Sequence, residues 1–123
     1  MHAIIVDDNE HHARLAAKIV EHACGDNPDV YTDPFMALRN SMTEHPDLIV
    51  TDMMMPKMDG ITLLREMRKE GIFAPAIIVS GHLKRVSEKL LPSNHIAAII
   101  PKPFQIEELS KAVIEAIAKN ASA

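Results

Sequence analysis

Five short runs of apolar, mostly β-branched residues recur along the chain, separated by segments with helical spacing. The runs cover residues 3–6, 30–32, 48–51, 76–79 and 96–100. The first, third and fourth contain continuous apolar triplets, which are typical of strands buried on both faces of a parallel sheet. The pattern therefore predicts five strands, three of them buried on both faces.

The segments between the runs carry apolar stripes that predict amphipathic helices. Asp33–Pro34 is a helix start signal, an acid that can cap the helix before a proline in its first turn. Gly71 ends the third stripe, and Pro92 cuts short a further helical segment over residues 83–91. The stripes consist of Leu15, Ile19 and Ala23; Phe35, Leu38 and Met42; Ile61, Leu64 and Met67; and Ile106, Leu109, Val113 and Ile117.

Strands that alternate with helices predict crossover units, and hence a parallel sheet with helices on both faces. Five such units form a three-layer α/β/α sandwich, and 123 residues suit a single domain over residues 1–123. Ligands of such sheets bind beyond the carboxyl ends of the strands. The residues that follow the runs are therefore the candidate functional residues.

Residues suited to phosphate or metal chemistry end or follow four of the five runs. The second run leads into Asp33, which we assign to helix capping. Each of the others alone is an ordinary turn or loop residue, and only their joint placement at one edge indicates function. The four sets are Asp7–Asp8, Asp52, Ser80 and Lys102–Pro103.

Three carboxylates brought to one edge repel one another. At about 4 Å and an effective dielectric constant near 20, each pair of like charges costs roughly 4 kcal/mol. A bound cation relieves this repulsion, and an all-oxygen donor set without Cys or His favours Mg²⁺ over zinc. Lys102 and Ser80 can stabilise phosphoryl oxygens, which leaves Asp52 as the predicted nucleophile.

Composition argues against some classes of function and indicates a cellular compartment. The net charge of −4 gives the protein no overall attraction to nucleic acid or anionic lipid. Cys24 is the single cysteine, so no intramolecular disulfide can form, which fits a reducing environment. The sequence begins without a signal-peptide pattern and has no apolar stretch of membrane-spanning length. We expect a cytoplasmic protein that does not bind membranes or DNA directly.

The loop from Asp52 to Gly60, with the sequence DMMMPKMDG, resembles the phosphoacceptor loop of the response-regulator receiver family. The acid pair Asp7–Asp8, Ser80 and the Lys102–Pro103–Phe104 sequence occur in the order of that family, and the resemblance covers residues 3 to 119. It implies the flavodoxin-like receiver fold, with a parallel sheet in the strand order 2-1-3-4-5.

The resemblance also implies roles at the metal site. Asp52 is phosphorylated. Asp8 and Asp52 bind Mg²⁺, for which Mn²⁺ can substitute, and Asp7 helps directly or through a water molecule. Met54 gives its backbone carbonyl to the metal, so its side chain is free for other roles.

Further roles follow for the residues around the phosphoryl group. Ser80 is the hydroxyl that moves toward it, and Lys102 forms an ion pair with it. Pro56 and Gly60 shape the loop and the start of the next helix. The peptide bond between Lys102 and Pro103 is cis in this family.

Three positions are expected to modulate the switch. Met54 and His82 lie two residues after Asp52 and Ser80, and we predict that they tune the lifetime of the phosphorylated state. The family usually has an aromatic residue three positions before the lysine, where this chain has Ile99. Coupling from Ser80 to the last strand then uses aliphatic repacking, or is weaker.

The expected partners follow from the same resemblance. A sensor histidine kinase or a phosphotransfer protein supplies the phosphoryl group, and a downstream protein or a separate output domain responds. The face built from the fourth helix, fifth strand and fifth helix is expected to change. The chain is not expected to be an enzyme beyond its own phosphorylation and dephosphorylation, and it is a monomer or a phosphorylation-dependent dimer.

Three alternatives share parts of the pattern. A phosphatase of the haloacid dehalogenase type also uses a nucleophilic Asp with Mg²⁺, but it needs a second Asp where this chain has Met54, and a cap domain. A flavodoxin-like FMN binder needs a Ser/Thr/Gly-rich loop where this chain has Asp7–Asp8. A degenerate receiver used only for docking is disfavoured by the intact acids, Ser80 and Lys102.

The histidines near the acid pair suggest a metal site, but a simpler interpretation is available. Glu10, His11 and His12 lie at the start of the first predicted helix. We expect them to be exposed helix residues rather than metal ligands.

Overall fold

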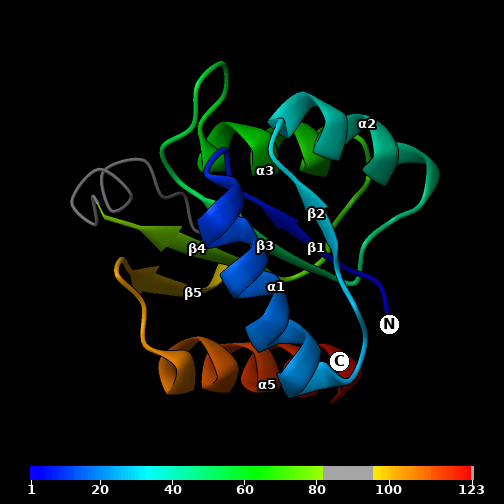
Figure 1. Ribbon diagram of the computed structural model, residues 1–123. Helices are drawn as coiled ribbons and strands as arrows, with labels where there is room; N and C mark the ends of the chain where they lie inside the picture. Colours follow the sequence, from blue (N-terminus) through cyan, green and yellow to red (C-terminus); the bar gives the residue numbers. More distant parts are fainter. Residues whose placement is uncertain (82–95, 123) are drawn as a thin grey trace.

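The computed structural model describes residues 1–81 and 96–122, and these residues form one five-stranded parallel sheet covered by four helices (Figure 1). The strand order β2-β1-β3-β4-β5 is the expected one. The strands are β1 (Ala3–Val6), β2 (Asp29–Tyr31), β3 (Leu48–Asp52), β4 (Ala76–Ser80) and β5 (Ile96–Pro101). The helices are α1 (Glu10–Cys24), α2 (Pro34–Thr43), α3 (Gly60–Lys69) and α5 (Ile106–Ser122).

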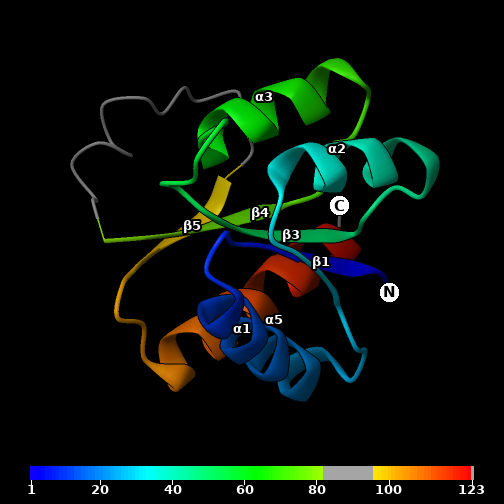
Figure 2. The same ribbon diagram turned by 45° about the horizontal axis from the view of Figure 1, so that its top comes forward.

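The sheet separates two hydrophobic cores. Helices α1 and α5 cover one face, and α2 and α3 cover the other (Figure 2). Side chains alternate along each strand, so Ile5 packs with the first pair of helices and Ile4 with the second. Burial on both faces explains why the central strands read as unbroken apolar runs.

The predicted strands agree with the observed ones to within a residue or two at their ends. The second run predicts residues 30–32, whereas β2 covers Asp29–Tyr31. The last strand extends to Pro101, which pairs with Ser80. Pro101 has no N–H group to donate. The backbone N–H of the next residue, Lys102, instead donates to the carbonyl of Ser80 over 2.8 Å.

The predicted apolar stripes are only partly correct. The third stripe is confirmed, since Ile61, Leu64 and Met67 are fully buried. In α1, Leu15 is 45% exposed, and in α5, Ile106 is 60% exposed. The buried positions of α1 are mainly alanines packed in the core that α5 also lines, since small side chains let two helices approach closely.

The second stripe is confirmed only at Leu38, which packs partly buried against the core. Phe35 and Met42 are about half exposed, while Ala37 and Ser41 are buried. Apolar spacing alone therefore did not reveal which side of this helix faces the sheet. The further helical segment over residues 83–91 lies outside the described residues.

Side-chain caps fix the helices that begin at the carboxyl edge of the sheet. Asn9, Asp33 and Asp59 are the N-caps of α1, α2 and α3, and each accepts a hydrogen bond from a backbone N–H of the first turn. The role assigned to Asp33 is thereby confirmed. None of the helices in the described part of the chain is long and apolar enough to cross a membrane.

Candidate functional site

The ends of four strands bring the predicted polar residues to one edge of the sheet. Asp7 directly follows β1, Asp52 and Ser80 are the last residues of β3 and β4, and Lys102 directly follows β5. Parallel strands end on the same side, so the topology alone places these residues near one another.

The three acidic residues form a compact cluster. One carboxylate oxygen from each of Asp7, Asp8 and Asp52 lies within 4.8 Å of the other two. Asp7 and Asp52 are buried, whereas Asp8 is exposed. Three hard oxygen donors in this arrangement fit a divalent cation, and Asp8 leaves the cluster open to solvent on one side.

Lys102 balances part of this negative charge. Its Nζ atom lies 2.9 Å from Oδ2 of Asp7 and 3.3 Å from Oδ1 of Asp52, and its side chain is 16% exposed. The Lys102–Pro103 peptide bond is cis, as expected. One ammonium group cannot neutralise three carboxylates, so the site retains a net affinity for cations.

The environment of Asp52 makes its carboxylate harder to ionise. Burial raises its pKa most, the charges of Asp7 and Asp8 raise it further, and the ammonium of Lys102 lowers it, leaving the pKa at about 6. A cation bound beside Asp52 would relieve the repulsion from the neighbouring carboxylates and favour its ionised form.

The loop after Asp52 is tied closely to the strand it leaves. Met53 is buried, and its N–H donates to the carbonyl of Val79 on β4. Gly60 starts α3, and its N–H donates to the Met53 carbonyl over 2.8 Å. A Cβ atom at Gly60 would overlap the backbone carbonyl of Asp52, so this close approach requires glycine.

Lys57 fixes the outer part of the same loop. It adopts a left-handed backbone conformation, with φ of 74°, which is uncommon outside glycine. Its Nζ lies 3.3 Å from Oδ2 of Asp33, the N-cap of α2. This contact could not be predicted from the sequence, because the two residues lie in different loops.

The remaining predicted residues take varied positions. Ser80 is completely buried at the end of β4, Ile99 is partly buried against the core shared with α3, and Met54 is 38% exposed. Pro56 is exposed in the loop. His82 lies outside the described residues.

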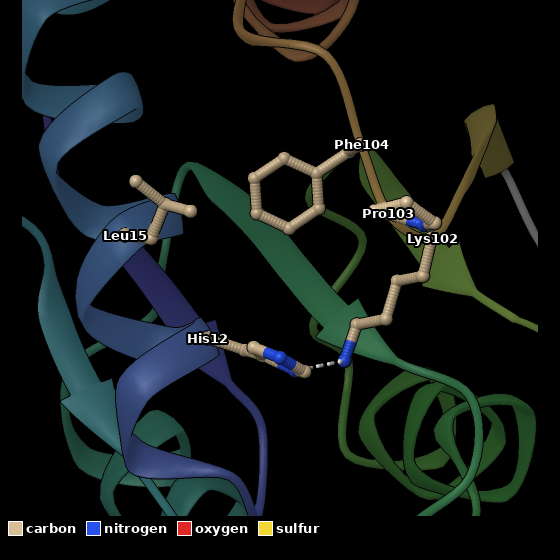
Figure 3. Close-up of a pocket in the computed structure, with 5 residues that line it drawn as sticks. All are labelled: His12, Leu15, Lys102, Pro103 and Phe104. Carbon is tan, nitrogen blue, oxygen red and sulfur yellow. Dashed lines mark hydrogen bonds between the residues drawn. The ribbon is translucent and has the colours of Figure 1, made fainter.

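His12, which the sequence predicts to be only an exposed helix residue, also reaches the site. The Nδ1 atom of His12, in the first turn of α1, lies 3.1 Å from Nζ of Lys102 (Figure 3). His12 is exposed, as expected, but its side chain contacts the predicted site residue Lys102. The sequence could have indicated this contact, because α1 begins just after the acid pair and its first turn must lie beside the site.

A pocket of about 380 Å³ opens beside this contact (Figure 3). His12 and Leu15 line it from α1, and Lys102, Pro103 and Phe104 line it from the loop between β5 and α5. Leu15 and Phe104 project toward one another across the pocket, so exposed apolar surface adjoins the lysine.

The chain belongs to the response regulator receiver domain family, whose model matches residues 3–114. It is thus a receiver domain, the phosphorylation-switch module of two-component signalling, and the haloacid dehalogenase alternative is not favoured.

Individual relatives place this module in different proteins. The receiver domain of Francisella response regulator 1452 is 30% identical, with a TM-score of 0.80 over 96% of this chain and 97% of that one. Sensor kinase CckA of Brucella abortus is 40% identical over 60% of this chain and 8% of the kinase. Protein-glutamate methylesterase/protein-glutamine glutaminase 2 of Rhizobium johnstonii is 34% identical over 78% of this chain and 26% of that protein. The chain therefore spans a small part of these two curated relatives, both of which are named as enzymes.

We expect Asp52→Asn to stabilise the metal-free protein at about pH 7.5 by about 2–3 kcal/mol. The pKa of Asp52 is raised on folding to about 6, so its stabilising contribution is full below the unfolded-state pKa and is lost as the pH rises through about 6. Urea unfolding followed by circular dichroism, with a chelator present, measures the difference. The gain should shrink to about 1 kcal/mol at about pH 4.5. A variant no more stable than wild type at the higher pH would contradict the assigned pKa.

Gly60→Ala should destabilise the fold by about 1–3 kcal/mol, because the new methyl group meets the backbone of Asp52. Helix propensity alone favours alanine by up to about 1 kcal/mol, so a loss of stability isolates the close contact. Gly81→Ala is the matched control, since a Cβ atom there meets none of the described atoms within 4 Å. Unchanged unfolding of Gly60→Ala would show that the loop adjusts without strain.

Proposed function

We propose that Asp52 is the phosphoacceptor of this receiver domain, and that a phosphohistidine on a sensor kinase or a phosphotransfer protein supplies the phosphoryl group. An oxygen of Asp52 forms the new O–P bond, the P–N bond of the phosphohistidine breaks, and the leaving imidazole takes up a proton. The observation that carries this proposal is the position of Asp52, buried between other carboxylates and a lysine at the carboxyl edge of the sheet.

Asp7, Asp8 and Asp52, together with the backbone carbonyl of Met54, are proposed to hold Mg²⁺, with Mn²⁺ as a substitute. The three carboxylates supply the hard oxygen donors that such ions prefer. The bound ion supplies charge neutralisation for the phosphoryl group.

Lys102 supplies the second positive charge. Its ammonium already contacts Oδ1 of Asp52, so a phosphoryl oxygen added there lies within reach of a short side-chain movement. The N–H of Lys102 donates to the Ser80 carbonyl, which links its loop to the end of β4. We propose that Ser80 turns its hydroxyl toward the phosphoryl group, and that Ile99 responds through aliphatic repacking.

The proposed partners follow from this chemistry. One matched relative is itself named as a sensor kinase, which supports a phosphohistidine donor. The responding partner is a downstream protein or an output domain, recognised through the face that includes β5 and α5; the fourth helix that the sequence predicts for this face lies outside the described residues. We propose a cytoplasmic receiver, monomeric or dimerising on phosphorylation, that has no enzymatic activity beyond its own phosphorylation chemistry and no direct contact with nucleic acid or membrane.

Beryllofluoride, a stand-in for the phosphoryl group, should bind at Asp52 when Mg²⁺ is present. Binding should shift the NMR resonances of residues between Ser80 and Ile106, because the added charge draws Ser80 and Lys102 inward. Asp52→Ala should abolish the response, whereas Asp26→Ala, which removes an exposed acid from the opposite edge, should preserve it. Binding that survives in Asp52→Ala would exclude Asp52 as the acceptor.

Two side chains are proposed to set the lifetime of the phosphorylated state. Met54 is 38% exposed two residues after Asp52, where its side chain can limit the access of water. His82 holds the corresponding position after Ser80. Met54→Asn and His82→Ala should change the rate of autodephosphorylation, measured by intact-protein mass spectrometry. Unchanged rates in both variants would rule out this role.

A further inference from the structure

The side chain of Lys102 is held from three directions. Its Nζ atom contacts Oδ2 of Asp7 at 2.9 Å, Oδ1 of Asp52 at 3.3 Å and Nδ1 of His12 at 3.1 Å. Figure 3 shows the lysine extending from its loop to the imidazole on α1. The ammonium group donates hydrogen bonds to Asp7 and His12, and its contact with Asp52 is an ion pair.

Donor and acceptor in the third contact follow from the charge of the lysine. An ammonium group can only donate hydrogen bonds, so Nδ1 of His12 must accept. The tautomer that fits this contact carries its proton on Nε2. Since Nδ1 of His12 faces an ammonium group, His12 is directed to the lysine rather than to the carboxylate cluster.

The position of His12 is coupled to that of the acids. The N–H of His12 donates to Oδ1 of Asn9 over 3.1 Å, and the N–H of Asn9 donates to Oδ1 of Asp7 over 2.9 Å. Asp7 thus contacts Lys102 directly through one oxygen, and connects through Asn9 to the turn that carries His12 through the other. These two bonds hold the backbone of the turn that carries His12 against Asp7.

The three acceptors draw the ammonium in different directions. Asp7 and Asp52 are buried, whereas His12 is exposed. Without the imidazole, the two carboxylates alone would draw the ammonium inward and pair it more tightly with the nucleophile. A carboxylate paired closely with a cation is a poorer nucleophile, and an ammonium drawn inward lies further from a donor that approaches from solvent.

We infer that His12 is a positioning residue for phosphoryl transfer: it holds the Lys102 ammonium on the solvent side of the carboxylate cluster, where it meets the incoming phosphoryl oxygens. The inference rests on the proposed function of Asp52 and Lys102. Neither the family match nor the acid cluster assigns a role to His12.

Three variants separate this role from a general structural one. His12→Leu keeps much of the side-chain volume but removes the acceptor. His12→Asn restores an acceptor, because the amide oxygen can occupy a position close to that of Nδ1. His11→Leu is the matched control, since His11 neighbours His12 on the same helix but lines a different pocket with Arg14 and Lys18.

The test combines two measurements on the full chain. Phosphorylation by acetyl phosphate with saturating Mg²⁺, followed by intact-protein mass spectrometry, should be about three- to tenfold slower at saturating donor in His12→Leu, as expected for the loss of the net contribution of one solvent-exposed hydrogen bond. His12→Asn should recover most of the rate, and His11→Leu should match wild type. Half-saturation by Mg²⁺ should change less than about twofold, because the carboxylates are intact.

The ¹⁵Nζ and ¹³Cε resonances of Lys102 provide a readout that does not depend on phosphorylation. They should move in His12→Leu and return toward the wild-type positions in His12→Asn. Unchanged resonances in His12→Leu would show that the contact is absent, and moved resonances with an unchanged rate would show that it has no positioning role; either result overturns the inference. If wild-type Asp52 is never phosphorylated, the proposed function fails and this inference fails with it.

Discussion

Repulsion among three carboxylates at the end of one parallel sheet is the constraint around which this molecule is arranged. Asp7, Asp8 and Asp52 converge because their strands end at the same edge, and two of the three are buried. Lys102 offsets only part of their charge, and the pKa of Asp52 remains raised. The same imbalance makes the site receptive to a divalent ion, and it makes the charge of a phosphoryl group a strong perturbation.

The surrounding fold keeps this unfavourable arrangement in place. Caps at Asn9 and Asp59 fix the helices that begin beside the acids, and Gly60 lets α3 start against the carbonyl of Asp52. Two apolar cores, one on each face of the sheet, supply the stability that the charged edge lacks. The charge repulsion is thus concentrated at the edge that carries the candidate site, and the ends of β4 and β5 lie directly beside it.

The sequence predicted the sheet and its functional edge more accurately than the outer helix faces. Apolar runs such as residues 48–51 can be read directly because strands buried on both faces leave no room for polar residues. The buried face of α2 could not be predicted from apolar spacing, because Ala37 and not Phe35 packs against the sheet. The contact of His12 with Lys102 joins residues 90 positions apart, and only the packing of α1 beside the last loop creates it.

Titration of the Asp52 carboxyl carbon by ¹³C NMR, without and with Mg²⁺, tests the central claim most directly. The account predicts a midpoint at about pH 6 in the metal-free protein, which moves well below that value when Mg²⁺ occupies the acid cluster. A midpoint near the ordinary value of about 4, with no response to Mg²⁺, would contradict it.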